Sequence, residues 1–307
     1  MTSTKKNLLI TGATGLIGSQ LSKRLIQEGW ALTVLGRRTE DKFRSEFSLP
    51  CRYFQWSHPT VNPPPREAMD VNAAIHLMGE SIAKSRWTRE LKQELKDSRI
   101  DTTALLVASL KNQPNLETFI CASAIGIYGD RGDETLTEAS SLDGGFLGAL
   151  CKEWESEARK IPCRSVQIRT GIVLSTRGGA LSTIAPLFKK RLGGHLGNGQ
   201  QWMSWIHIDD LVEIYVRALT DSSLKGPVNA VAPNPERNKD FTQDLAQALH
   251  VKALLPAPRT ALKLVLGEMA QTILASERVI PKRLEETGFQ FKYPTLKGAL
   301  AAVYPQF

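Results

Sequence analysis

A chain of 307 residues is long enough for one large α/β domain, or for a domain with an added lobe, and too short for three domains. Its hydrophobic content of 42% and charged content of 23% are typical of globular proteins, and no apolar stretch reaches the roughly 18 residues of a membrane span. The formal net charge of +8 is spread along the chain without a run of five basic residues, so we expect a basic, solvated surface and no nucleic-acid partner.

The first half of the chain alternates short apolar runs with helical patterns. A helix is predicted over residues 16–28 and a long one over residues 89–111. Strands are predicted at residues 7–10, 31–35, 51–56, 71–78 and 119–122. Apolar strands between amphipathic helices indicate a parallel sheet covered on both faces. Right-handed crossovers between such strands make it a doubly wound Rossmann sheet, an α/β fold.

The second half is less regular. It contains predicted strands at residues 166–174, 203–208 and 228–231, helices over 209–219 and from about 239, and proline-bounded helices over 256–307. We therefore expect residues 1–165 to form the Rossmann core. Residues 166–307 are expected to complete the sheet and to form a small α/β lobe over its carboxyl edge, on the substrate side.

Cysteine usage and the N-terminus bear on the compartment. The cysteines lack the spacing of metal ligands, and they are Cys51, Cys121, Cys151 and Cys163. We expect free thiols in a reducing compartment and no metal site. The apolar run at residues 7–10 is shorter than the roughly 7–15 residues of a signal-peptide core. The sequence therefore predicts a cytoplasmic protein without a membrane partner.

Three glycines, Gly12, Gly15 and Gly18, follow the first predicted strand and open the first predicted helix. In this context G-x-x-G-x-x-G is typical of a dinucleotide site. The first glycine allows a tight turn, the second lets the backbone approach a pyrophosphate, and the third lets the helix pack on the strand. The pyrophosphate then lies on the helix N-terminus. We predict cofactor contacts from Gly12, Thr14, Gly15, Leu16, Ile17 and Gly18.

The end of the second predicted strand distinguishes NADP from NAD. An NAD site usually places Asp or Glu about 20 residues beyond the glycines, where it bonds the ribose hydroxyls. This chain has Gly36-Arg37-Arg38 there, with no carboxylate to repel a phosphate. Two guanidinium groups can bind a 2′-phosphate in bidentate fashion. The sequence favours NADP(H) over NAD, with Arg37 and Arg38 as ligands; the alternative is that both arginines are only solvated.

Further motifs continue along the chain. They include His76-Leu77-Met78-Gly79, Ser123 to Gly129, Arg169 to Leu174, and Trp205 to Asp210. With the glycine loop, they resemble the extended short-chain dehydrogenases/reductases, and more specifically the YfcH-like epimerase family within the NAD-dependent epimerase/dehydratase superfamily. The resemblance covers nearly the whole chain. It implies a Rossmann domain with a small C-terminal lobe, bound NADP(H), and a relation to nucleotide-sugar epimerases and dehydratases. Leu77 and Gly79 are predicted to join the cofactor contacts.

The acid/base residues of this superfamily are not present in register. Its working reductases use Tyr-x-x-x-Lys with a Ser or Thr, and the tyrosine passes a proton as hydride moves. Lys152 is a candidate for the lysine, but the residue four positions earlier is Gly148. The usual Ser/Thr position is Ala124, and Ser123 lies one residue away, which on a strand end changes the direction of its side chain.

Several residues remain candidates for the chemistry. Tyr128 could reach the nicotinamide or only stabilise its own turn. Lys152 could hold the nicotinamide ribose or lie on the surface, and Ser123 completes the candidate catalytic set. Cys151 is placed near a helix start, where a thiol pKa can fall; the alternative is a small buried residue. A substrate pocket is predicted from Glu80, Arg86, Cys151 and Trp205; the alternatives are a surface ion pair for Glu80 and Arg86 and core packing for Trp205.

These alternatives leave two functions. The sequence favours an atypical NADP-dependent oxidoreductase or epimerase that acts on a small molecule, with sugars among the candidates. The alternative is a non-catalytic NADP(H)-binding protein that senses redox state or binds a protein partner, and the incomplete triad supports it. Whether the protein forms a homodimer is left open.

Overall fold

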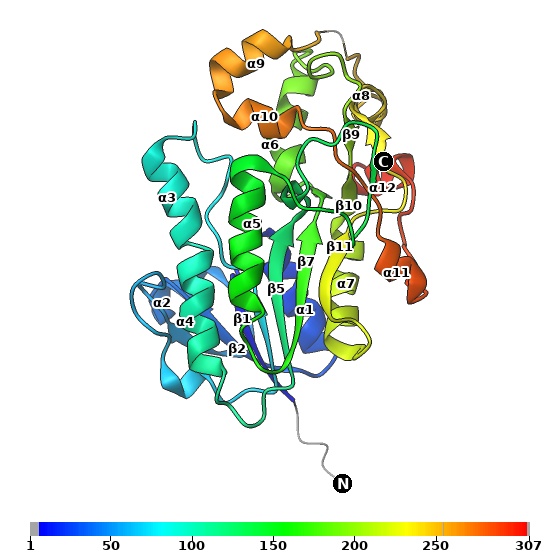
Figure 1. The fold of residues 1–307 in the computed structure, drawn as a ribbon. Helices are drawn as coiled ribbons and strands as arrows, with labels where there is room; N and C mark the ends of the chain where they lie inside the picture. The colour runs from blue at the N-terminus through cyan, green and yellow to red at the C-terminus, as the bar shows by residue number, and fades with distance from the viewer. Residues whose placement is uncertain (1–5, 254, 306–307) are drawn as a thin grey trace.

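The computed structural model describes residues 6–253 and 255–305. Its centre is a seven-stranded parallel sheet in the order β11-β7-β5-β4-β1-β2-β3 (Figure 1). The strands are β1 (Asn7–Thr11), β2 (Ala31–Gly36), β3 (Cys51–Gln55), β4 (Ala73–His76), β5 (Thr118–Ala124), β7 (Arg164–Thr170) and β11 (Gly226–Ala230). The strand order reverses between β1 and β4, so the crevice beyond their carboxyl ends is the expected ligand position. The predicted Rossmann fold is confirmed.

Helices cover both faces of this sheet (Figure 1). The α-helices of the described residues, including those of the small lobe, are α1 (Leu16–Gln27), α2 (Glu40–Glu46), α3 (Arg89–Asp97), α4 (Ile100–Leu110), α5 (Gly145–Ala158), α6 (Gly179–Lys189), α7 (Ile208–Thr220), α8 (Asn238–Ala248), α9 (Arg259–Leu266), α10 (Met269–Ile273), α11 (Lys282–Glu286) and α12 (Leu296–Val303). The period of two in β1 explains the two layers. Leu8 and Ile10 pack with Leu21 of α1, whereas Leu9 packs on the opposite face with Leu106 of α4.

Two predicted elements are each broken in two. The helix predicted over residues 89–111 is interrupted between α3 and α4. At the break, Ser98 Oγ accepts a hydrogen bond from the Glu80 N–H at 3.1 Å, and the Arg99 guanidinium donates to the Glu80 carbonyl at 2.8 Å. The strand predicted over residues 166–174 ends at Thr170 because the chain leaves the main sheet at Gly171. A Cβ on Gly171 would lie 2.7 Å from the Ser204 carbonyl oxygen.

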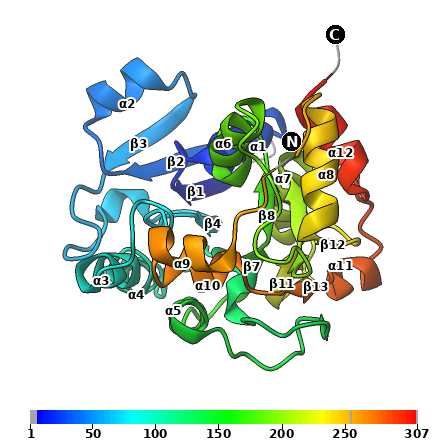
Figure 2. The same ribbon diagram turned by 90° about the horizontal axis from the view of Figure 1, so that it is seen from above.

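The remaining strands build the small lobe as two-stranded sheets. They are β6 (Thr135–Leu136), β8 (Ile172–Leu174), β9 (Trp202–Met203), β10 (Trp205–His207), β12 (Glu236–Arg237) and β13 (Arg278–Val279). Seen from above, α9 and α10 lie between α3 and α4 on one side and α8 and α12 on the other (Figure 2). Figure 1 places the same two helices at the carboxyl end of the sheet. Within the described residues, no helix is both long and apolar enough to cross a membrane.

Candidate functional site

The glycine loop joins β1 to α1 through close backbone contacts. Gly12 has a φ of +70°, and a Cβ there would lie 3.0 Å from the Leu77 carbonyl group. A Cβ on Gly18 would lie 2.1 Å from the Gly12 carbonyl oxygen. The Gly15 N–H closes the turn by donating to that same oxygen at 3.0 Å. Side chains at positions 12 and 18 are therefore excluded by backbone, which is the reason the sequence has glycine there.

The end of β4 is held beside this loop. The Leu77 N–H donates to Thr11 Oγ1 at 3.1 Å, and this oxygen lies 2.8 Å from His76 Nδ1. Burial lowers the pKa of His76 to about 3, so the imidazole is neutral at physiological pH. A fixed hydroxyl–imidazole contact therefore sets the distance between the glycine loop and the Leu77–Gly79 segment.

A cavity of about 720 Å³ opens beyond the carboxyl ends of β2, β3 and β4. It is lined by Arg37, by residues 57–60 after β3, by residues 78–80 after β4, and by the adjoining faces of α3 and α4. Its volume lies within the roughly 300–1,000 Å³ range of small-molecule sites. The lining residues beyond β3 and on α3 are absent from the sequence prediction. Residues 57–60 follow the carboxyl end of β3 just as Arg37 follows that of β2. Their position after a parallel strand could therefore have identified them.

The two arginines after β2 have different surroundings. Arg37 lines the cavity and forms an ion pair with Glu80, with Nη1 2.6 Å from Oε1. Arg38 instead pairs with Glu46 at 3.4 Å, and its carbonyl accepts a hydrogen bond from the Tyr53 hydroxyl. Of the two arginines, Arg37 is the one that lines this cavity. The loop supplies the close backbone approach, the cavity supplies the volume, and Arg37 supplies the positive charge, so these residues fit a phosphorylated dinucleotide.

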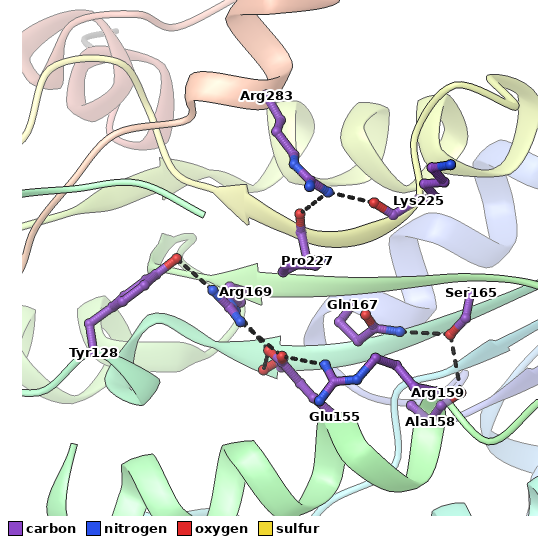
Figure 3. Close-up of polar contacts among 11 residues, drawn as sticks. Tyr128, Glu155, Ala158, Arg159, Ser165, Gln167, Arg169, Lys225, Pro227 and Arg283 are labelled. Carbon is purple, nitrogen blue, oxygen red and sulfur yellow. Dashed lines mark hydrogen bonds and ion pairs between the residues drawn. The ribbon is translucent and has the colours of Figure 1, made fainter. Parts of the chain in front are cut away.

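A buried polar network occupies the carboxyl ends of β5, β7 and β11 (Figure 3). The Arg169 guanidinium donates to Glu155 Oε1 at 2.8 Å and to Oε2 at 2.9 Å, and donates again to the Tyr128 hydroxyl at 2.8 Å. Tyr128 in turn donates to Asn229 Oδ1 at 2.7 Å. Ser123 donates to Glu155 Oε1 at 2.8 Å.

This network bears on two of the predicted catalytic residues. Tyr128 is 0% exposed, and its hydroxyl has two partners. Burial raises the pKa of Tyr128 to about 12, although Arg169 opposes the shift. Ser123 is also buried and bonded to Glu155. This placement argues against proton transfer by either group and indicates that both side chains hold the ends of neighbouring strands together.

Two pocket predictions need correction. Cys151 lies in the middle of α5 rather than at a helix start, it is buried, and burial raises the pKa of its thiol to about 12. Trp205 is completely buried in β10, where its indole N–H donates to the Asn234 carbonyl, so it does not border a pocket. The sequence pattern could not show that the side chains of Cys151 and Trp205 are buried, because their burial depends on which distant segments of the chain pack over them.

The other predicted residues lie apart from one another. Lys152 is exposed on α5, and its contact with a cofactor stays a prediction. Glu80 belongs to the cavity that contains Arg37. Arg86 is exposed, and its guanidinium lies 3.2 Å from where a Cβ on Gly267 would be, near the start of α10. The structure does not bring Glu80 and Arg86 together.

Comparison with known proteins places the chain in a family. A sequence profile described as the NAD dependent epimerase/dehydratase family matches residues 8–146. An epimerase family protein of Arabidopsis thaliana, a chloroplastic SDR39U1 homologue, is 38% identical over 96% of this chain and 85% of its own length. The chain belongs to the NAD-dependent epimerase/dehydratase family. A second profile, a domain of unknown function named DUF1731, matches residues 257–303 of this family member.

Solved structures show the same fold for this family member. Human epimerase family protein SDR39U1, crystallised with NADPH, is 30% identical and superposes with a TM-score of 0.87, over 98% of this chain and all of that one. A nucleoside-diphosphate sugar epimerase from Corynebacterium glutamicum is 34% identical, with a TM-score of 0.78, over 98% of this chain and 59% of that one. The small lobe as well as the Rossmann core is therefore shared.

The buried ion pair gives a first testable prediction. Glu155→Ala leaves the Arg169 guanidinium buried without its carboxylate, and we expect the free energy of unfolding to fall by about 3–5 kcal/mol. Glu153→Ala, on the exposed side of the same helix, removes only a 3.9 Å contact with Lys96 and should cost about 1 kcal/mol or less. Urea denaturation of both variants measures the difference, and equal losses would contradict a special role for the pair.

Proposed function

We propose that this protein binds NADP(H) and acts as an atypical oxidoreductase or epimerase on a small molecule. Two observations carry the proposal: Arg37 lines a cavity beyond the ends of β2, β3 and β4, and the backbone contacts of the glycine loop after the neighbouring strand β1 allow no side chain at Gly12 or Gly18. The 2′-phosphate would contact Arg37, and the pyrophosphate would lie on the N-terminus of α1. The NADPH in the related human structure supports this choice over NAD.

The chain's own residues supply binding and orientation in this proposal. Arg37 is paired with Glu80, so a phosphate must compete with that carboxylate for the guanidinium. The dinucleotide, when bound, supplies hydride transfer. Sugar-like substrates are favoured because the related Corynebacterium glutamicum protein is described as a nucleoside-diphosphate sugar epimerase.

A second candidate function is that of a non-catalytic NADP(H)-binding protein, which senses redox state or binds a partner. The observation that favours it is the state of the predicted acid/base groups. Tyr128 is bonded to Arg169 and Asn229, and Lys152 is exposed. The two candidates differ in turnover rather than in cofactor affinity.

Cofactor choice gives the second prediction. Arg37→Gln should weaken NADPH binding at least about tenfold, because a hydrogen bond to a charged group contributes roughly 1.5–3 kcal/mol, and should leave NADH affinity nearly unchanged. Arg38→Gln is the matched control, since Arg38 pairs with Glu46 outside the cavity lining. Titration of nicotinamide fluorescence measures both variants. Equal losses for NADPH and NADH in Arg37→Gln would show that Arg37 does not contact the 2′-phosphate.

The glycine loop gives the third prediction. A Cβ on Gly15 would meet only the Gly12 carbonyl oxygen, at 3.3 Å, and the φ of −76° at Gly15 suits any residue. Gly15→Val should therefore fold but lose dinucleotide binding, because the branched side chain fills the space of the pyrophosphate. Circular dichroism checks folding and fluorescence titration checks binding. A folded variant with unchanged NADPH affinity would move the cofactor away from this loop.

Turnover separates the two functions in the fourth prediction. NADPH bound to the protein should be oxidised by at least one member of a panel of keto-sugars and small carbonyl compounds. The decrease in NADPH absorbance measures this, and Gly15→Val serves as the control that lacks the cofactor site. Tight binding with no oxidation across the panel would favour the non-catalytic candidate.

A further inference from the structure

Glu277 lies where the C-terminal segment crosses the carboxyl end of the central strand β5. Its backbone N–H donates to the Trp202 carbonyl at 3.1 Å, and its carbonyl accepts from Ser204 Oγ at 2.7 Å, so the segment is fixed to the small lobe. Its carboxyl Oε1 lies 3.9 Å from where a Cβ on Gly126 would be. Gly126 belongs to η2 (Ile125–Ile127), the turn directly after β5, and Leu147 of α5 approaches the same point.

Among the described residues, this carboxyl group has no polar partner. In residues 6–253 and 255–305, no hydrogen bond or ion pair reaches the Glu277 side chain, although it is half-buried. Burial raises the pKa of Glu277 to about 8, and the negative charge of Asp130 adds to the shift. A half-buried carboxyl without a partner contributes nothing evident to stability, and such groups cluster at functional sites.

The sheet order places this carboxyl group at one end of the proposed cofactor site. Arg37 follows β2, the glycine loop follows β1, and Glu277 lies above the end of β5, on the far side of β4. A dinucleotide that has its 2′-phosphate on Arg37 and its pyrophosphate on the glycine loop extends its nicotinamide toward β4 and β5. Glu277 therefore lies at the nicotinamide end.

We infer that Glu277 is the proton-transfer group of this site, in the role that a tyrosine has elsewhere in the superfamily; the inference rests on the proposed function. In the reducing direction, the substrate's carbonyl carbon accepts a hydride, with its two electrons, from NADPH, which becomes NADP⁺. The carbonyl oxygen takes the proton of Glu277, which becomes a carboxylate, and water then reprotonates that carboxylate. The new negative charge on Glu277 forms together with the positive charge of the oxidised nicotinamide, so each stabilises the other.

The other titratable groups around Glu277 do not compete for this role. Asp130 accepts hydrogen bonds from the N–H groups of Ser276 and Gly132, which hold its carboxylate in place. The Cys151 thiol on α5 is buried, and burial raises its pKa to about 12. Arg99 is bonded to the Glu80 carbonyl.

The charge pairing allows a test that needs no substrate. The dissociation constants of NADP⁺ and NADPH are measured from pH 6.5 to 9.5, and their ratio is followed because effects of the shared 2′-phosphate cancel in it. As Glu277 ionises through a pH of about 8, NADP⁺ should gain at least about fivefold in affinity relative to NADPH, the effect of two opposite charges about 4 Å apart even at the dielectric constant of water. Glu277→Gln should abolish this pH dependence.

Two further variants make the result unambiguous. Glu277→Asp keeps the charge and should retain the pH dependence. Glu268→Gln removes an exposed carboxylate, paired with Lys92 near α10, and should behave as the wild type. A ratio that does not change with pH in the wild type, or that changes equally in Glu277→Gln, would overturn the role of Glu277. Failure of both cofactor forms to bind at any pH would instead overturn the proposed function itself.

Discussion

Arg169 and Glu155 form a doubly hydrogen-bonded ion pair that is almost completely removed from water, with side-chain exposures of 3% and 1%. Arg169 belongs to β7 and Glu155 to α5, so the pair fixes the helix against the sheet at the end where ligands bind in doubly wound folds. Through Arg169 the pair also holds Tyr128, and through Tyr128 it reaches Asn229 on β11. Removing one partner of so deeply buried a pair strongly lowers the stability of the fold, because the remaining charge is left without a partner.

This network separates the polar groups at the carboxyl edge into two kinds. Tyr128 and Ser123 are bonded on the inside of the network, where they position strands and turns. Arg37 and Glu277 lie outside it, at opposite ends of the line that runs from β2 to β5. The proposed cofactor would lie along this line. Under our proposal the cofactor keeps its position although Gly148 stands where the superfamily's tyrosine is expected, and Glu277 takes over the proton transfer.

The sequence predicted features that depend on local backbone requirements. Gly12 and Gly18 are demanded by contacts within one strand–turn–helix unit, and the alternation of Leu8, Leu9 and Ile10 reflects the two faces of one strand. Where a feature depends on packing between distant segments, the sequence either did not predict it or predicted it wrongly. Trp205 is buried because a separate lobe covers it, and Glu277, more than a hundred residues beyond Gly148, reaches the end of β5 where we propose that the nicotinamide lies. No periodicity or motif carries that information.

The most direct measurement of the central claim is a crystal structure of the protein grown with NADPH. The account predicts density for the pyrophosphate on the N-terminus of α1 beside Gly15, the 2′-phosphate within hydrogen-bond distance of Arg37 in exchange for Glu80, and the nicotinamide between the end of β5 and the Glu277 carboxyl group. A cofactor bound with its 2′-phosphate away from Arg37, or with its nicotinamide on the β3 side of the glycine loop, would contradict it.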